Sequence, residues 1–538
     1  MSETMKFRRL GTMIDCSRNA VMKLDAVKKW IDITASLGYN TLSLYLEETY
    51  ELDGEPYFGH LRGRYSQEEL RQIDDYAYSK GMEVIPCIQT LAHLNALFHW
   101  PVYQQIRDTA DILLAGDDRV YELVDKMFAT FKKTLRTNII NIGMDEAHML
   151  GRGQYLDRNG LQDRFDILMA HLNRVSALAE KYGFQLLMWG DMFFRIAAGG
   201  DYYADHVQIS DEVKSQVPAN VKLVYWDYYS LDPDHYDRQI EVHAAINEGI
   251  WFAGGLWTWA GFAPRNAFSI ESMGLAMDSC LRHGVQDVFM TLWGDNGSEC
   301  SKFAILPSLY YVAERAKGNE DLASIKAGFE NKFGIPFDAF MLLDLPGTPN
   351  AAVDTLQNPN KYMLYCDCFL GQFDNRVAPG DADAYRSCAE ALSQWENASE
   401  YGYLFRAMSA LCQVLAIKVD LGLRTRRAYL ENDRTALAGL VGVYDELVQK
   451  VDRFYEVHRQ RWMLENRPFG FDVQDLRIGG LIQRIRHCRH QLTAYLDGTL
   501  ERIEELEAPV LDYEGDTSAT LEPNCCNVWE RIATASVL

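Results

Sequence analysis

Asp145 and Glu146 are adjacent acids that end an apolar run beginning at Asn138. Two carboxylates at one site can divide acid–base work, because one can carry a proton while the other stays ionised. Successive side chains of a strand point to opposite faces, so both acids can serve one site only where the strand ends and its twist relaxes. Acids that satisfy the free N–H groups of a helix N-terminus are the alternative, which we rank below catalysis.

Further acids and aromatic residues follow other apolar runs at comparable points. Those that we expect to bind substrate are Arg18, Glu47, His93, Trp189, Asp191, Trp226, Trp259, Trp293, Asp295 and Glu299. Sugar rings carry hydroxyls around the edge and C–H bonds on each face, so acids hold the edge and indoles stack on the face. A single tryptophan could equally belong to the core, but five of them, including Trp257, favour a sugar site. The planar guanidinium of Arg18 can reach two hydroxyls.

The histidines and cysteines do not indicate a metal. His93 is expected to orient Glu146 or a sugar hydroxyl, and His148 to be an ordinary packed histidine. The chain has no His-Glu-x-x-His motif and no Cys-x-x-Cys spacing, so we expect no metal and no cofactor. We interpret the eleven cysteines, including the close pairs Cys366/Cys368 and Cys525/Cys526, as free thiols that are buried or incidental.

Alternating strands and helices must position these residues. Apolar runs predict eight strands, at residues 10–16, 41–46, 83–89, 139–144, 185–189, 222–226, 250–256 and 287–292. An amphipathic stretch after each predicts a helix, with a capping box from Ser66 to Glu69 and a glycine, Gly183 or Gly249, closing later helices. Eight such units predict an α/β fold, a (β/α)8 TIM barrel, with its active site at the carboxyl ends of the strands.

Past residue 318 the strand pattern gives way to long amphipathic stretches at 382–398, 400–430, 433–465 and 472–506. We therefore expect a catalytic barrel over residues 1–318, a connecting segment over 319–350, an α-helical domain over 351–506 and an irregular tail over 507–538. The helical domain could form a homodimer surface, cover the pocket as a lid, or only pack against its neighbours.

Composition restricts the partners and the compartment. The 538 residues are 48% hydrophobic and 24% charged, which is typical of a soluble globular protein. A net charge of −23 argues against nucleic acid or an acidic membrane as a partner, because both require a basic surface. We find no apolar signal core at the start and no apolar stretch of membrane-spanning length, so a cytoplasmic protein is expected.

The motifs resemble glycoside hydrolase family 20, the β-N-acetylhexosaminidases. The family's strand-four motif reads His or Asn, any residue, Gly, a small residue or Met, Asp, Glu, and Asn141-Ile-Gly-Met-Asp-Glu146 matches it throughout. The Asp-x-x-Arg of Asp15 and Arg18 is similar to the family's strand-one pattern. Trp189 and Trp293 fall where the family places walls of its sugar pocket. The resemblance covers about the first 315 residues.

The chain departs from the family pattern at three strand ends. The family's Pro-Gly-His is only Leu91-Ala-His93, the acids and His of strand two become Tyr45-Leu-Glu-Glu48, and Trp257-Thr-Trp259 replaces a Tyr-x-Asp. Tyr228 then becomes the candidate for holding the substrate's acetamido oxygen. The small α/β domain that often precedes the barrel is missing, which suggests a short intracellular branch with a helical C-terminal domain.

The resemblance implies an exo-acting, retaining mechanism in which the substrate's own 2-acetamido oxygen attacks the anomeric carbon, giving an oxazolinium-like intermediate. Glu146 would protonate the leaving oxygen and then activate water, a double task that favours a pKa raised by its apolar surroundings. Asp145, as an anion, would accept the acetamido N–H. Trp189, Trp226 and Trp293 would enclose the acetyl group, and Arg18 with Asp295 or Glu299 would hold the outer hydroxyls of a terminal β-linked N-acetylglucosamine or N-acetylgalactosamine.

Two other functions stay open. A β-glycosidase on the same barrel could use Glu146 as its acid and another carboxylate, such as Asp191 or Glu299, as an enzyme nucleophile. A sugar-binding protein without turnover is the second possibility, although both acids are intact.

Overall fold

A computed structural model describes residues 5–203, 209–350, 358–513, 515 and 528–538. The chain forms two compact units. The barrel unit comprises Met1–Leu256, Ser269–Leu292 and Leu309–Glu320, and the helical unit comprises Trp257–Phe268, Trp293–Ser308 and Asp321–Leu538. The segments that directly follow the last two strands of the barrel therefore belong to the helical unit.

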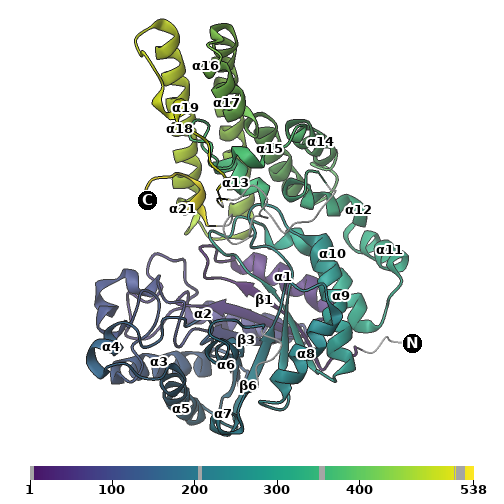
Figure 1. Ribbon diagram of the computed structural model, residues 1–538. Helices are drawn as coiled ribbons and strands as arrows, with labels where there is room; N and C mark the ends of the chain where they lie inside the picture. Colours follow the sequence, from purple (N-terminus) through teal and green to yellow (C-terminus); the bar gives the residue numbers. More distant parts are fainter. Residues whose placement is uncertain (1–4, 204–208, 351–357, 514, 516–527) are drawn as a thin grey trace. The chain divides into compact units, whose positions relative to one another are not determined.

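Eight parallel strands close into a barrel in which each strand pairs with the next and the last pairs with the first (Figure 1). They are β1 (Arg9–Asp15), β2 (Thr41–Leu46), β3 (Glu83–Ile88), β4 (Ile139–Asn141), β5 (Gln185–Trp189), β6 (Val221–Trp226), β7 (Trp251–Gly255) and β8 (Asp287–Leu292). The predicted (β/α)8 barrel is confirmed. Every residue of β2, β7 and β8 is buried, as expected for parallel strands covered on both faces. Asp287, at the start of β8, binds two arginines near the start of β1. It accepts from Arg8 Nε at 2.9 Å and from Arg9 Nη1 at 3.3 Å.

Helices follow each strand of the barrel. They are α1 (Leu24–Leu37), α2 (Gln67–Ser79), η1 (Leu97–His99), η2 (Pro101–Ile106), α3 (Asp118–Thr134), α4 (Gln154–Asn159), α5 (Arg164–Tyr182), α6 (Asp191–Ala197), α7 (Asp211–Gln216), α8 (Pro233–Ala244), α9 (Asn266–Arg282) and α10 (Leu306–Lys317). The capping box of Ser66 and Glu69 is present, and Gly183 ends α5 in the left-handed conformation. The prediction for Gly249 is wrong, because α8 ends at Ala244 with Ala245 as its cap.

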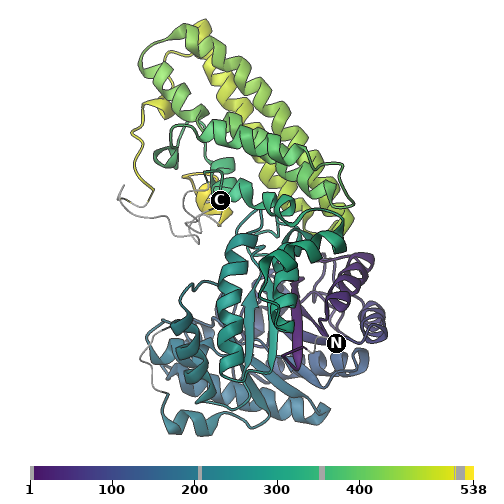
Figure 2. The ribbon, with the colours of Figure 1, turned by 90° about the vertical axis from the view of Figure 1, so that its right-hand side faces the viewer.

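The helical unit is built around two long helices, α17 and α18, which lie side by side in both views (Figures 1 and 2). Its elements are η3 (Lys302–Ile305), α11 (Leu322–Phe333), α12 (Phe337–Phe340), η4 (Met341–Gly347), α13 (Pro359–Tyr365), η5 (Asp374–Arg376), α14 (Asp381–Ser393), α15 (Gly402–Lys418), α16 (Leu421–Leu430), α17 (Arg434–Glu465), α18 (Phe471–Asp497), α19 (Glu504–Glu507) and α21 (Trp529–Ile532). The amphipathic stretch 400–430 is two helices, and 472–506 is interrupted at Gly498, which has φ 83°. The proposed domain boundaries stay predictions.

The described residues bear on two expectations from the composition, those for membrane-spanning stretches and for cysteines. None of their helices is long and apolar enough to cross a membrane. The nine cysteines among them are buried free thiols, and these include Cys366 and Cys368. The pair Cys525/Cys526 lies outside the described residues.

Candidate active site

The chain leaves β4 through backbone that only a few residue types adopt readily. Gly143, Met144 and Glu146 have φ values of 72°, 69° and 51°. The Asn141 side chain accepts the Gly143 N–H at 3.0 Å and the Gln89 side chain accepts the Met144 N–H at 3.2 Å, and these bonds hold the turn. The regular alternation of the strand is lost here, so two consecutive acids need not point to opposite faces.

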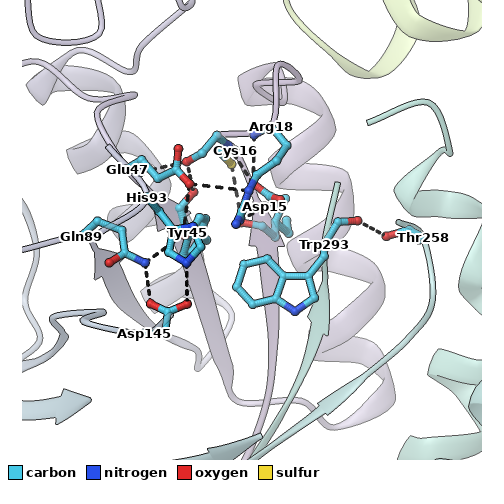
Figure 3. A network of polar contacts seen from close by, with 12 residues as sticks. Asp15, Cys16, Arg18, Tyr45, Glu47, Gln89, His93, Asp145, Thr258 and Trp293 are labelled. Carbon is cyan, nitrogen blue, oxygen red and sulfur yellow. Dashed lines mark hydrogen bonds and ion pairs between the residues drawn. The ribbon is translucent and has the colours of Figure 1, made fainter. Parts of the chain in front are cut away.

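Asp145 is held as an anion by two neighbours (Figure 3). Gln89 Nε2 donates to its Oδ1 at 2.7 Å, and His93 Nε2 lies 3.1 Å from its Oδ2. Burial alone would raise the pKa of Asp145, but His93 and the Gln89 hydrogen bond lower it below its ordinary value. Burial likewise opposes charge on His93, yet Asp145 raises the pKa of His93 to about 9. The pair is therefore an ion pair near neutral pH.

Glu146 lies among charged groups. Its side chain is 39% exposed, and its Oε1 lies 3.3 Å from Arg195 Nη2 while His93 Nε2 lies 3.7 Å from its Oε2. The expectation of apolar surroundings is therefore wrong, because two cations face the carboxylate. Asp191 anchors both the backbone and the arginine, since its Oδ2 accepts the Glu146 N–H at 3.0 Å and Arg195 Nε at 2.9 Å.

Arg18 is fixed at the ends of β1 and β2. The carboxylate of Asp15 lies 3.3 Å from Arg18 Nη1 and also accepts the Arg18 backbone N–H, which explains the Asp-x-x-Arg spacing. Arg18 Nε lies 3.5 Å from Glu47, and the guanidinium lies over the Tyr45 ring at 4.6 Å. Burial raises the pKa of Glu47 to about 7 although Arg18 opposes the shift. Part of this network is seen in Figure 3.

The aromatic residues of the barrel unit that were predicted for the site differ in their exposure. Trp226 and Tyr228 stack with their rings 5.3 Å apart, and Tyr202 packs on Trp226 at 4.7 Å. Trp189 is only 1% exposed and packs on Phe289, at a ring separation of 5.9 Å. Trp226 and Tyr228 are 9% and 4% exposed, so they lie closer to solvent than Trp189 does.

The remaining predicted site residues belong to the helical unit. Trp257 and Trp259 stack at 4.5 Å, and the Trp293 carbonyl accepts from Thr258 Oγ1 and from Lys302 Nζ, each at 2.7 Å. Asp295, two residues further on, is partly exposed.

Glu299 is enclosed by cations of the helical unit. Its side chain is 1% exposed, and its two oxygens lie 2.8 Å from Lys361 Nζ and 2.9 Å from Arg477 Nη1. Both oxygens are thus engaged by cations of the chain itself.

Sequence reasoning missed three residues of this network, and its expectation for His148 is also wrong. Gln89 and Tyr45 end apolar runs and could have been found by comparing strand ends, but Arg195 lies within α6 and carries no such signal. His148 is exposed instead of packed, and its carbonyl accepts from Arg164. Within the described ranges, no three His, Cys, Asp or Glu side chains are arranged to hold a metal ion.

The chain is similar in sequence to two proteins named Hexosaminidase D. Hexosaminidase D of Bos taurus is 25% identical over 333 residues, which cover 56% of this chain and 90% of that protein. Human Hexosaminidase D is 23% identical over 221 residues, 39% of this chain and less than half (43%) of the human protein. The crystal structure of a GH20 exo β-N-acetylglucosaminidase from Vibrio harveyi superposes with a TM-score of 0.48 at 16% identity, over 63% of this chain and 59% of that one.

Two family models match separate parts of the chain. The catalytic domain of glycosyl hydrolase family 20 matches residues 6–232, which include Asp145, Glu146 and most of the described network. The glycoside hydrolase 20C C-terminal domain matches residues 338–526, within the helical unit. The chain therefore belongs to glycoside hydrolase family 20 and is a glycoside hydrolase.

Proposed function

We propose that this protein is an exo-acting, retaining β-N-acetylhexosaminidase that removes terminal β-linked N-acetylglucosamine or N-acetylgalactosamine through substrate-assisted catalysis. The observation that carries the proposal is the pairing of Asp145 with His93 at 3.1 Å beside a partly exposed Glu146. One carboxylate is kept ionised by its own neighbours, while the next is open to a ligand. Substrate-assisted retention needs this division.

In this mechanism the substrate supplies the nucleophile. Asp145 accepts the acetamido N–H, which orients the acetamido oxygen for attack on the anomeric carbon and stabilises the positive charge of the cyclic intermediate. Glu146 gives its proton to the leaving glycosidic oxygen and then removes a proton from the attacking water. Tyr228 is our candidate for holding the acetamido oxygen, because it stacks beside Trp226 and is slightly exposed.

Binding of the terminal sugar rests on the charged residues at the ends of β1 and β2. Arg18 is 20% exposed on its side chain and is held by Asp15 and Glu47, so its fork is preorganised for hydroxyls. We propose a hydroxyl-binding role for Arg18 with Glu47, and a stacking role for Trp226. Trp293 and Asp295 stay candidates through the family resemblance, and Trp259 stays a candidate through its place after the seventh strand.

An enzyme nucleophile is less well supported. Asp191, the first rival candidate, is fully buried, and its Oδ2 already accepts two hydrogen bonds. Glu299, the second, is enclosed by Lys361 and Arg477. A nucleophile needs access to the anomeric carbon, and neither carboxylate offers it.

The test is hydrolysis of the nitrophenyl β-glycosides of N-acetylglucosamine and N-acetylgalactosamine beside those of glucose and galactose, repeated with a thiazoline mimic of the cyclised intermediate. Cleavage of the acetamido sugars alone, with inhibition by the thiazoline, is the expected result. Cleavage of the plain glycosides would indicate an enzyme nucleophile instead. No cleavage of any substrate would favour a sugar-binding protein.

A further inference from the structure

Asp191 and Arg195 connect α6 to the proposed acid in two places. The Asp191 carboxylate receives the backbone N–H of Glu146, and the Arg195 guanidinium lies 3.3 Å from the Glu146 side chain. The two residues also bind each other at 2.9 Å, one helical turn apart. A backbone anchor and a side-chain anchor thus act on the same residue, and each is fixed by the other.

The burial of Asp191 and Arg195 suits the positioning of Glu146 and does not suit the binding of a sugar. The Asp191 side chain is 0% exposed and that of Arg195 is 17% exposed. The Arg195 guanidinium lies over the rings of Tyr202 and Trp226, at 5.7 and 5.9 Å. Tyr202 is in turn fixed, since its hydroxyl contacts His243 Nε2 at 3.1 Å and accepts the Trp226 N–H. Arg195 is therefore held from two sides before any substrate binds.

We infer that Asp191 and Arg195 are positioning residues that aim the Glu146 carboxylate and balance the charge beside it, an inference that rests on the proposed acid role of Glu146. A general acid beside an uncompensated guanidinium would lose its proton too readily. The Asp191 anion compensates that charge while leaving the guanidinium in place to orient the carboxylate.

Other titratable groups face this pair. His93 and Asp145 lie in the loops after β3 and β4, His148 follows Glu146 on the same loop, and Tyr202 lies beyond α6. Burial, together with Asp145 and Glu146, raises the pKa of Asp191 to about 7, so its charge changes near neutral pH. The balance of charge between Asp191 and Arg195 consequently shapes the pH profile of the reaction.

The experiment compares D191N and R195Q with the wild type, using kcat and KM over a range of pH. Loss of the cation in R195Q favours protonated Glu146, so the alkaline limb of kcat/KM moves to higher pH. Loss of the anion in D191N leaves Arg195 uncompensated, so the limb moves to lower pH. We expect kcat on a disaccharide to fall about 10-fold or more in both, with KM changed less than about 3-fold, because a positioning role acts through Glu146 and not through binding of the sugar. An activated dinitrophenyl leaving group should show a smaller fall.

Two further variants keep the result interpretable. R195K retains the charge and should keep the limb near its wild-type position while restoring part of kcat, even if R195Q folds poorly. R282Q is the matched control, because Arg282 pairs with Asp237 at 2.9 Å on the barrel's outer helices. Displacement of the limb in the same direction by D191N and R195Q, or a higher KM with unchanged kcat, would overturn the inference. Normal cleavage of the disaccharide by E146Q would instead remove the proposed function itself.

Discussion

At the scale of single residues, the site gives two adjacent carboxylates different environments. Asp145 is enclosed by Gln89 and His93, and Glu146 is partly exposed beside Arg195. The two acids are adjacent in the sequence, so the difference comes from the neighbours that each side chain contacts. Separate environments for paired carboxylates are a general means of assigning acid and anion roles.

The acid role predicts unequal losses in E146Q. Cleavage of natural linkages should fall by roughly 10²-fold or more, because the leaving oxygen is no longer protonated. Nitrophenyl substrates with acidic leaving groups should lose much less, and kcat measured on both substrate classes gives the comparison. Equal losses on both classes would count against Glu146 as the acid.

The His93–Asp145 pair predicts a pH-dependent contribution to stability. The pKa of His93 rises from 6.5 to about 9 on folding, so its stabilisation is complete below about pH 6.5 and is lost as the pH rises through about 9. Each pKa unit corresponds to about 1.4 kcal/mol, so the gap between wild type and H93N should shrink by on the order of 3 kcal/mol from pH 6 to pH 10. Denaturant unfolding across that range measures it, with H283N, at an outer His–Asp pair, as control. A gap that does not change with pH would contradict the ion pair.

At the scale of elements, the end of β4 is where the fold makes the site. The strand stops at Asn141, three residues earlier than the apolar run indicates, because positive φ values at Gly143 and Met144 end the pairing. A Cβ on Gly143 would lie 2.1 Å from Gln89 Oε1 and 2.7 Å from the Ile88 carbonyl. Glycine is therefore required for close approach as well as for its conformation.

Two glycine variants separate these causes. G143A should destabilise the protein by a few kcal/mol and lower kcat, because the substituent displaces the turn that carries both acids. G183A has nearly the same φ, 71° against 72°, with nothing within 4 Å of its Cβ, so only the conformational cost of about 1 kcal/mol remains. Thermal unfolding and kcat of the two variants give the comparison. Similar effects would show that close packing at Gly143 is unimportant.

Many of the strand positions could be predicted from the sequence. The ranges 41–46, 185–189 and 287–292 agree with β2, β5 and β8, since hydrophobic runs bounded by turn residues define buried parallel strands well. Contacts made by tertiary structure could not be predicted. Arg195 reaches Glu146 across 49 residues of sequence, and the cations around Glu299 come from helices far along the chain. No local sequence pattern predicts either of these contacts.

At the scale of the whole molecule, the residues that follow β7 and β8 fold as part of the helical unit. Helices α13, α17 and α18 each contribute a cation to the segment after β8: Lys361 and Arg477 bind the Glu299 carboxylate, and Arg461 donates to its carbonyl at 2.7 Å. Burial lowers the pKa of Lys361 although Glu299 opposes the shift. The helical unit is thus required for the local structure of a segment that begins one residue after a barrel strand.

The buried cluster predicts a large effect of E299Q. Lys361 and Arg477 would be left facing each other without a counter-charge, which costs about 3–5 kcal/mol in comparable buried pairs. E456Q breaks an exposed pair with Arg459 and should cost less than about 1 kcal/mol. Denaturant unfolding followed by helical circular dichroism compares the two. A small effect of E299Q would mean that water reaches the cluster.

The central claim is that the substrate's acetamido oxygen is the nucleophile, and the most direct measurement varies that oxygen. Fluorine on the acetyl group withdraws electrons from the carbonyl, so a series of nitrophenyl glycosides from acetyl to trifluoroacetyl weakens the nucleophile while leaving the leaving group unchanged. We predict that kcat/KM falls steeply along the series, by about 10-fold or more per step. A rate that is indifferent to fluorination would contradict the account and assign the nucleophile to the enzyme.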